Sequence, residues 1–317
     1  MAVDCLSVGI LVADHLCSPI PRVPRVGELI LADSLPLRPG GCAVNAAIDL
    51  AKVGVQVGVV GCVGVDAFGN YLIDVMNKSG VETSGVRRDP TVETSGSLII
   101  NVDGEDRRYI HSIGASASVR PEDIPLERVR SAKVLYVGGY LLMKGLLDGA
   151  LTPVFRAARA AGVITALDVV LPGPGDHWPQ LEGLLAETDL FLPNTDEAAV
   201  ITGLNDPVAQ ADRFRAAGAK TVVITCGEHG TVLVNDQVRL RANIFRMNYV
   251  GGAGSGDAFD AGYIAALLAG GDERTCLAWG SALGASCVRA VGTTEGVFNK
   301  AEVEAFLADN RLEIKEL

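Results

Sequence analysis

Aromatic residues are scarce in this chain of 317 residues, at 5% of the sequence, and histidine occurs only 4 times. The histidines lack the spacing of a zinc site, and few aromatic rings are available to stack on a nucleoside base. Basic residues are outnumbered, with 27 lysines and arginines against 38 aspartates and glutamates, for a formal net charge of −11. This balance argues against a nucleic-acid partner but leaves room for a small anionic ligand bound by a local basic patch.

Long apolar runs and paired cysteines are missing as well. No stretch reaches the roughly 18 apolar residues that span a membrane, and Asp4 breaks the early apolar run that a signal peptide would need. The 7 cysteines are an odd number and include no Cys-x-x-Cys pair. We interpret them as small reduced core residues of a cytoplasmic protein that has no membrane partner. The alternative is that one of them is a lone catalytic thiol.

Strand and helix signals alternate along most of the chain, in which 49% of residues are apolar. Strand-like runs occur at residues 6–12, 55–63, 133–137, 163–168, 189–192 and 221–225, and helix-like segments such as 43–53 and 68–79 separate them. Buried strands that alternate with helices predict an α/β fold whose mainly parallel sheet is covered on both faces. Ligands of such sheets bind beyond the carboxyl ends of the strands.

Two segments interrupt this alternation. Residues 13–38 are rich in proline and show little periodicity, and residues 95–112 have the pattern of a β-hairpin whose turn contains Asp103-Gly104. Together they predict a small β-sheet that stands off the main domain, and the alternative is two surface excursions with no shared role. Because no linker, repeat or low-complexity tract divides the chain, we expect a single domain over residues 1–317.

The most informative run is Gly251-Gly252-Ala253-Gly254-Ser255-Gly256-Asp257, between a short strand signal at residues 247–250 and a buried helix signal. Glycines before a helix let backbone N–H groups converge, and the helix N-terminus adds about half a positive charge. This predicts a phosphate site in which Asp257 is the base for an incoming hydroxyl. A structural N-cap and an ordinary glycine turn are the alternatives, and the run matches neither the P-loop nor the dinucleotide fingerprint.

Polar residues near the N-terminus are candidates for binding a polyol. Asp14 follows the first strand signal, and the pair Gly40-Gly41 precedes a helix that contains Asn45. A carboxylate and an amide can hold several hydroxyls, and paired glycines let the backbone approach a ligand closely. Taken alone, Asn45 could equally be a first-turn helix residue with no other role.

A second polar group follows the strand signal at residues 189–192. Asn194 and Glu197 are three residues apart and therefore lie on one face of a helix. They could order water around Mg²⁺, which keeps much of its hydration in proteins. The alternative is a capping box, because the two residues also have the spacing of an N-cap and its N3 position.

The order of these and other motifs resembles the PfkB (ribokinase-like) family of carbohydrate and nucleoside kinases over nearly the whole chain. The resemblance rests on Gly40-Gly41-x-x-x-Asn45, Gly64-x-Asp66-x-x-Gly69, the lid-like stretch from Thr94 to Ala115, Asn194-x-x-Glu197, Thr225-Cys226-Gly227-x-x-Gly230, and Gly254-Ser255-Gly256-Asp257. It implies a ribokinase-like three-layer α/β/α fold with a β-sheet lid. It also implies transfer of the γ-phosphoryl group of ATP, with Mg²⁺, to a hydroxyl of a small polyol, with a sugar favoured.

The resemblance also implies a role for each matching residue. Asp257 is the base, and the backbone N–H groups of Gly254, Ser255 and Gly256 form the anion hole. Acceptor-binding positions are Asp14, Gly40, Gly41 and Asn45, while Asn194 and Glu197 support Mg²⁺ through water. Nucleotide-binding positions are Asn194, Thr225, Gly227 and Gly230, with Ser281 beside the adenine. The lid segments exclude water from the reaction and imply a homodimer.

The chain departs from the family pattern at three places. Gly251 and Ala253 stand where the family usually has aspartate and threonine, and this weakens the expectation of activation by a monovalent cation. Ser281 stands where many members have asparagine, which weakens the expectation of ATP over other triphosphates. We therefore keep a non-catalytic sensor of sugar or nucleotide as an alternative function.

The sequence says little about which acceptor is used. Tyr140 follows a predicted strand and could stack on a ring or simply pack. Arg107, Arg108 and His111 on the hairpin, like Arg22 and Arg25, could reach an anionic group of a sugar acid or sugar phosphate. Arginine on an exposed hairpin is more often a solvated residue. A nucleoside kinase on the same fold is the other alternative.

Overall fold

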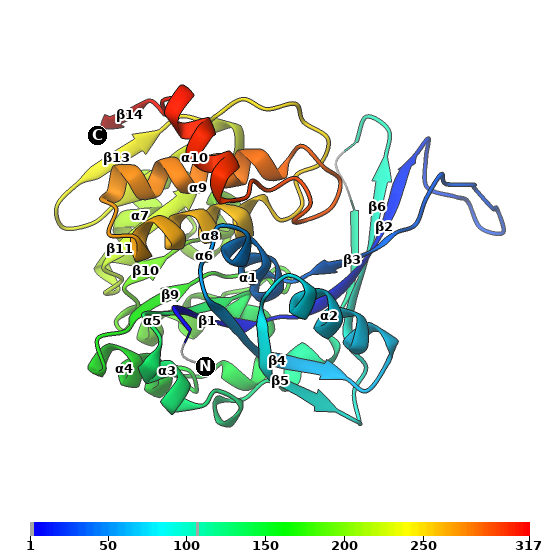
Figure 1. The fold of residues 1–317 in the computed structure, drawn as a ribbon, viewed down its shortest axis with the longest axis horizontal. Coiled ribbons are helices and arrows are strands. Elements are labelled where there is room, and N and C mark those ends of the chain that lie inside the picture. Colours follow the sequence, from blue (N-terminus) through cyan, green and yellow to red (C-terminus); the bar gives the residue numbers. More distant parts are fainter. Residues whose placement is uncertain (1–2, 106–107) are drawn as a thin grey trace.

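The computed structural model of the chain describes residues 3–105 and 108–317. In this described part, ten strands form one central sheet (Figure 1). Their order across the sheet is β14 (Ile314–Glu316), β13 (Arg239–Ala242), β12 (Thr231–Val234), β11 (Thr221–Thr225), β10 (Leu190–Phe191), β9 (Ile164–Leu167), β8 (Val134–Gly138), β1 (Cys5–Gly9), β4 (Val57–Gly64) and β5 (Glu82–Asp89). The strands from β11 to β5 are parallel, as the alternation of strands and helices predicted.

The direction in which the chain winds changes at β1. This strand pairs in parallel with β4 on one side and with β8 on the other, in a register that places Gly9 opposite Gly138. The chain first completes the edge formed by β4 and β5, and it then returns through β8 to build the other half of the sheet. Ligands of open α/β sheets bind at such a switch point, so the carboxyl ends of β1 and β8 mark where a site is expected.

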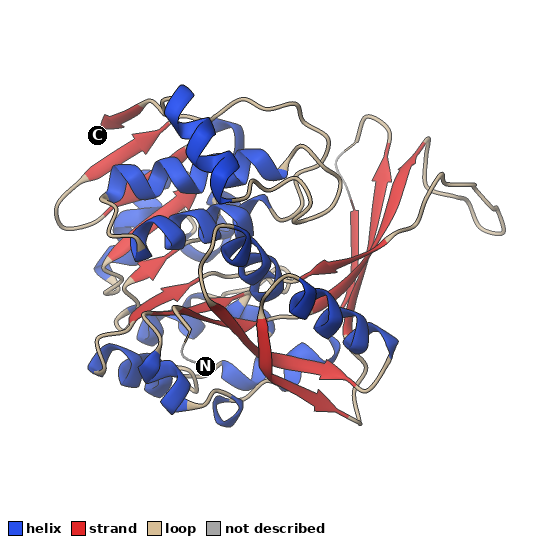
Figure 2. Ribbon diagram, viewed as in Figure 1, coloured by secondary structure: helices blue, strands red, loops and turns tan. Residues whose placement is uncertain are grey.

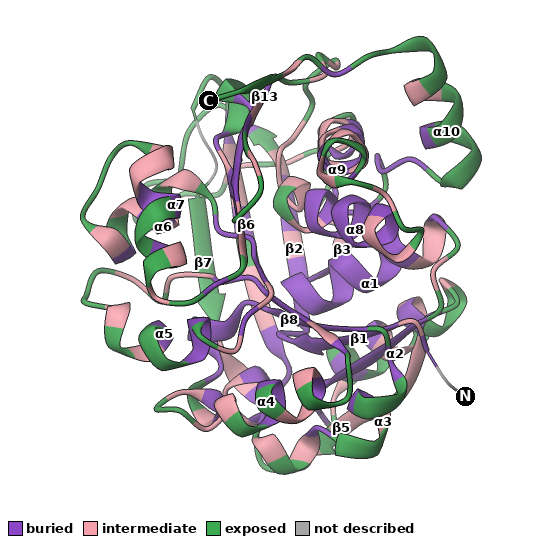
Figure 3. Cartoon of the chain, turned by 90° about the vertical axis from the view of Figure 1, so that its left-hand side faces the viewer, coloured by how far each residue is buried: buried purple, intermediate pink, exposed green. Residues whose placement is uncertain are grey.

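Helices cover both faces of the central sheet, which gives the three layers of an α/β/α fold (Figure 2). One apolar core lies under α3 (Leu126–Ser131), α4 (Thr152–Ala160), α5 (Trp178–Leu185), α6 (Thr195–Thr202) and α7 (Pro207–Ala216). The other lies under α1 (Cys42–Lys52), α2 (Ala67–Lys78), α8 (Ser255–Leu268), α9 (Glu273–Cys287) and α10 (Lys300–Asp309). Figure 3 shows that α1 and α8 are mostly buried, so both are core helices.

The two segments that interrupt the alternation form a separate four-stranded sheet, as predicted. Its order is β3 (Leu37–Gly40), β2 (Val12–Ile20), β6 (Ser95–Val102) and β7 (Arg108–Ser112), and it stands beside the main body (Figure 1). The hairpin β6–β7 is antiparallel, whereas β2 and β6 are parallel neighbours. We call this sheet the lid. Asp14 lies inside β2 of the lid, not at the end of a central strand as the sequence suggested.

One predicted strand is wrong. Residues 247–250 are not in a strand, although they are apolar enough for one. The edge of the central sheet that follows β13 is already paired with β14, so no partner strand is available. Instead, the backbone N–H groups of Val250 and Gly251 donate to the Val288 carbonyl at the end of α9. These hydrogen bonds hold the start of the glycine-rich run, residues 251–257, against the end of α9.

Two expectations from composition can be compared with the structure. All seven cysteines are free and buried, as expected for reduced core residues. Among the described residues, none of the helices combines the length and the apolarity needed to cross a membrane.

Candidate active site

The start of α8 has the geometry of an anion-binding helix terminus. Gly254 is its N-cap with a φ of 79°, and a Cβ atom there would lie 2.4 Å from the Thr293 carbonyl oxygen, so only glycine fits. The first-turn N–H groups of a helix have no intrahelical acceptor. In this structure the Ser255 N–H donates to the Gly252 carbonyl at 3.3 Å. Gly256, the next residue, is exposed.

Asp257 is held in place by residues that are distant in sequence. The Asn45 amide donates to its carboxylate at 2.8 Å, and the Asn45 carbonyl oxygen lies 2.9 Å from the Thr293 hydroxyl. Burial raises the pKa of Asp257, and the hydrogen bond from Asn45 lowers it in part because it stabilises the charged form. A raised pKa is typical of a carboxylate that acts as a base near neutral pH.

Asp257 belongs to a cluster of carboxylates. One ligand atom each of Cys42, Asp168 and Asp257 lie within 4.8 Å of one another. Asp168 follows β9, is 9% exposed, and accepts a hydrogen bond from the Gly139 N–H at 3.0 Å. Burial raises its pKa well above the ordinary range, and the negative charges of Glu197 and Asp257 raise it further.

Glu197 and Asp260 extend this cluster. Burial raises the pKa of Glu197 to about 7 and that of Asp260 well above its ordinary value, and the charge of Asp257 adds to both shifts. Within residues 3–105 and 108–317, no ion pair involves Glu197, Asp260, Asp168 or Asp257. Neighbouring carboxylates without a counter-cation fit a bound divalent cation, which would neutralise their repulsion.

Asp14 approaches the same cluster from the lid. It is 6% exposed, and one of its carboxylate oxygens has no hydrogen-bond partner among the described residues. Burial raises its pKa to about 6, a hydrogen bond from Ser97 opposes this shift, and the charge of Asp257 adds to it. Gly40 makes room for the carboxylate, since a Cβ atom there would lie 1.9 Å from Asp14 Oδ2. A buried carboxylate oxygen without a donor suits the hydroxyl of a bound polyol.

Asp14 is part of a polar row across the four strands of the lid. It lies opposite Arg38 of β3 and Ser97 of β6, and Ser97 lies opposite His111 of β7. Directly opposed residues point to the same face of a sheet, so all four share the face of Asp14. The Ser97 hydroxyl and His111 Nδ1 are 3.1 Å apart, and Arg38 Nε is 2.5 Å from Glu295 Oε1.

A cavity of about 900 Å³ lies beside the start of α8. It is lined by all five residues predicted to bind nucleotide, namely Asn194, Thr225, Gly227, Gly230 and Ser281, and also by Ser255 and Gly256. A parallel bridge links Asn194 to Thr225, so the ends of β10 and β11 bring these residues together. The size of the cavity is that of a small-molecule site.

Asn194 and Glu197 form the capping box that the sequence left as an alternative. The Asn194 side chain accepts from the Glu197 N–H at 2.9 Å, and the Glu197 carboxylate accepts from the Asn194 N–H at 3.0 Å. This capping uses one oxygen of each side chain. It also fixes Glu197 within range of the charge of Asp257, so capping and a second role are compatible.

The structure separates other predicted residues from the site. Tyr140 is fully buried in a core, its hydroxyl lies 3.2 Å from the Gln180 carbonyl oxygen, and it does not line the cavity beside α8. Arg108 is half exposed and pairs with Glu105 beside the hairpin turn, as a solvated residue does. Arg107 lies outside the described residues.

Three residues near Asp257 were not identified from the sequence. Asp168 is the last residue of the strand predicted at residues 163–168 and follows the observed β9, so the rule that selected Asn194 could have found it. Thr293 lies in a loop after α9, and its hydroxyl also lies 2.9 Å from the Pro39 carbonyl oxygen. Cys42 looked like an ordinary core residue. No sequence signal marks Thr293 or Cys42, because their role comes from contacts between distant segments.

The fold combines a mainly parallel sheet with a β-sheet lid. The site has a carboxylate beside the first-turn N–H groups of a helix. Together these features define a ribokinase-like phosphotransferase. The chain matches the model of the pfkB family of carbohydrate kinases over residues 4–300. It therefore belongs to this family, whose members transfer a phosphoryl group to an alcohol acceptor.

Individual relatives agree with this assignment. The chain is 28% identical over 288 residues to 5-dehydro-2-deoxygluconokinase of Photobacterium profundum, covering 83% of this chain and 85% of the relative. It is 24% identical over 305 residues to ribokinase of Haemophilus influenzae, covering 95% and 97%. The structure of Arabidopsis thaliana ribokinase complexed with ribose and ATP is similar, with a TM-score of 0.85, 25% identity, and coverage of 97% of this chain and 99% of that one.

The contact between Asn45 and Asp257 leads to a prediction about pH dependence. Because the hydrogen bond stabilises the ionised carboxylate, the variant Asn45→Ala should have a higher pKa at Asp257. The base must be ionised to accept a proton, so the acidic limb of the kcat profile should move to higher pH. The profile is measured at saturating acceptor and nucleotide, with the exposed residue Asn77→Ala as a control. An acidic limb that stays in place would contradict the assignment of Asp257.

The burial of Asp14 leads to a prediction about stability. Its pKa of about 6 lies above the ordinary value for aspartate, so the folded state binds the proton more tightly than the unfolded state does. Its stabilising contribution is present below pH ~4 and is lost as pH rises through ~6. Asp14→Asn should therefore raise the melting temperature at pH 8, with a smaller gain at pH 4.5. Asp33→Asn, exposed on the loop after β2, should change neither value. An equal gain at both pH values would contradict this account.

Proposed function

We propose that the chain is an ATP-dependent kinase that phosphorylates a hydroxyl of a small sugar or sugar derivative. The observation that carries this proposal is the position of Asp257. Ser255 and Gly256, which precede Asp257 at the start of α8, line the large cavity. On the other side, the negative charge of Asp257 raises the pKa of Asp14 in the lid. The base thus lies between a pocket that fits a nucleotide and a buried carboxylate that fits a polyol.

The proposed reaction uses these groups in order. Asp14 and Asn45 hold hydroxyls of the acceptor, and one hydroxyl lies against Asp257. As the acceptor oxygen attacks the γ-phosphorus of ATP, its O–H bond breaks and the proton passes to the Asp257 carboxylate. The new O–P bond forms while the bond to the β-phosphate oxygen breaks, so ADP leaves. The N–H groups at the start of α8 stabilise the charge on the phosphoryl oxygens.

Mg²⁺ fits beside Glu197 and Asn194, which would hold it through water, and the charges of Glu197 and the buried Asp168 carboxylate act on each other. When bound, it would offset the charge of the phosphates. A carboxylate-bound monovalent cation does not fit as well, since Gly251 has no side chain. A Cβ atom at Gly251 would lie 3.0 Å from the Ala290 carbonyl oxygen, so the loop after α9 leaves little room. We therefore propose turnover without activation by potassium, to be tested by comparing rates in potassium and sodium.

The acceptor class rests on the relatives and on the lid. The relatives are named for ribose, fructose and a deoxyketogluconate, so a sugar or a sugar acid is the favoured acceptor. The Arabidopsis structure contains ribose and ATP, which supports the same pair of substrates here. In the lid, the row containing Asp14 ends in Arg38 and His111, and these two residues, in place of Arg108, are the groups that could reach a carboxylate on the acceptor.

We also propose that the lid forms a homodimer. Leu98 and Ile110 are directly opposed on β6 and β7, they lie on the face opposite to Asp14, and they are 38% and 63% exposed. Exposed apolar pairs on a sheet are typical of an interface. Ile110→Asp should sediment as a monomer at concentrations where the parent chain is a dimer, with Thr83→Asp as a control on β5. Equal sedimentation of parent and variant would contradict the interface.

The kinase assignment predicts a specific effect of Asp257→Asn. Asparagine keeps the shape of the side chain but cannot accept the proton, so turnover should fall by about 10²- to 10⁴-fold. Nucleotide affinity should stay within a few-fold, because Asp257 does not line the large cavity.

The assay measures ADP release from Mg-ATP with neutral pentoses and hexoses, sugar acids, sugar phosphates and nucleosides. Turnover by the parent chain with one sugar class, lost in Asp257→Asn, is the expected result. Turnover with nucleosides alone would show that the acceptor is a nucleoside and not a sugar. Nucleotide binding without turnover of any acceptor would favour a sensor, and retained turnover in the variant would identify a different base.

A further inference from the structure

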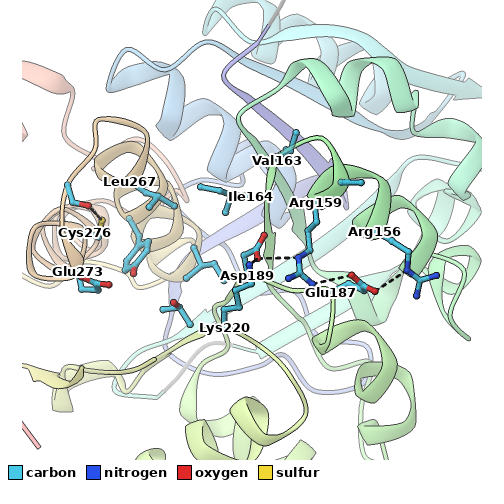
Figure 4. Close-up of a pocket in the computed structure, with 16 residues that line it drawn as sticks. Arg156, Arg159, Val163, Ile164, Glu187, Asp189, Lys220, Leu267, Glu273 and Cys276 are labelled. Carbon is cyan, nitrogen blue, oxygen red and sulfur yellow. Dashed lines mark hydrogen bonds and ion pairs between the residues drawn. The ribbon is translucent and has the colours of Figure 1, made fainter. Parts of the chain in front are cut away.

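A second cavity, of about 700 Å³, lies beside the amino ends of the parallel strands of the central sheet (Figure 4). It is lined by the first residues of three parallel strands, Ile164 of β9, Leu190 of β10 and Thr221 of β11. The carboxyl ends of the same strands lead to the candidate active site. The two cavities therefore lie at opposite ends of the same strands, and the second cavity is not part of the proposed kinase site.

One wall of this cavity is a row of alternating charges. Arg156 Nε is 3.0 Å from Glu187 Oε1, and Arg159 Nη1 is 3.1 Å from Glu187 Oε2. Arg159 Nε is also 3.4 Å from Asp189 Oδ1, which is 2.6 Å from Lys220 Nζ. Figure 4 shows these side chains side by side. Three cations share two carboxylates, so the row itself carries one excess positive charge, and Glu273 on the opposite wall balances it in the cavity as a whole.

The excess positive charge faces outward. The carboxylates of Glu187 and Asp189 are only 19% and 15% exposed, whereas the side chains of Arg156 and Lys220 are 68% and 58% exposed. Each of these two cations has a single carboxylate partner, so donors remain for a ligand. A carboxylate or phosphate group could therefore bind at the ends of the row without breaking it.

The opposite wall is apolar apart from the Tyr263 hydroxyl and the Glu273 carboxylate. It comes from the end of α8 and the first turn of α9, with Leu267, Tyr263 and Cys276. Tyr263 is 4% exposed and lines the cavity. Its hydroxyl can donate to a polar atom of a ligand bound there. Glu273 also lines this wall, and its carboxylate accepts from the Asn235 amide at 3.0 Å.

We propose that this cavity is a second binding site, for a small organic anion with an apolar body. The carboxylate or phosphate of the ligand binds Lys220 and Arg156, the apolar body packs on Leu267 and Ile164, and a polar atom meets the Tyr263 hydroxyl. The charge row provides the anion recognition, and the helix ends provide the apolar surface.

The test uses ligand-observed saturation-transfer NMR on the full chain with three probes of one shape. Naphthoate and naphthyl phosphate carry the two candidate anions, and naphthalenemethanol is their neutral counterpart. Mg-ATP is present at saturation to occupy the large cavity. We expect at least one anionic probe to bind under these conditions, and to bind more tightly than the neutral probe. The two anionic probes together show whether carboxylate or phosphate is preferred.

Variants of residues that line the second cavity test whether the probe binds there. Lys220→Gln should weaken binding by about tenfold or more, because it removes a charge-assisted hydrogen bond. Tyr263→Phe removes only the hydroxyl and should weaken binding by about two- to tenfold, and Leu267→Trp should block the cavity. Lys78→Gln is the matched control, since Lys78 also has one carboxylate partner, 2.7 Å away on α2. Circular dichroism melts check that each variant is folded.

Four results would overturn the proposal. The first is no binding of either anionic probe, and the second is equal binding of the neutral probe. The third is an affinity that Lys220→Gln and Leu267→Trp both leave unchanged while the variants remain folded. Displacement of the probe by Mg-ATP would place it in the large cavity and would also overturn the proposal.

Discussion

The hydrogen bond from Asn45 to Asp257 joins the starts of α1 and α8, and the geometry of the candidate active site depends on it. Thr293 supports the junction from a third segment, with its hydroxyl near Asn45 and its backbone against Gly254. Gly254 has a left-handed backbone conformation and lies in close contact with Thr293. Because only glycine fits there, α8 begins where these segments meet. The orientation of Asp257 is therefore set by three parts of the chain, and α8 alone could not provide it.

This junction lies in a region of concentrated negative charge. Asp14, Asp168, Asp260 and Glu197 surround Asp257, and their pKa values are all raised chiefly by burial. Burying carboxylates without cationic partners destabilises the folded state. Such an arrangement is understandable where a ligand supplies the missing groups, since hydroxyl donors and a divalent cation would satisfy it. The site thus exchanges stability of the empty protein for affinity in the occupied one.

The sequence was sufficient for the layered fold, and the five residues that it assigned to nucleotide binding line one cavity. Local patterns identified the parallel strands, and β11 has the predicted bounds, because a buried apolar run between turns has few alternatives. The lid was also foreseen from its hairpin. The strand expected at residues 247–250 failed because its apolar pattern carries no information on whether a sheet edge is free. Tyr140 and Thr293 show the same limit, since burial of one and the contact of the other depend on residues far away in sequence.

The large sequence separation between Asn45 and Asp257 has a consequence for synthesis of the chain. Asn45 and Asp257 are 212 residues apart. At roughly 5–20 residues per second, a ribosome needs about 10–40 s to bridge that interval. During this time β1, β4 and α1 can form without the helices α8 and α9 that later cover them. The apolar face of α1 therefore lacks the helices that cover it in the folded protein until the C-terminal third of the chain has been synthesised.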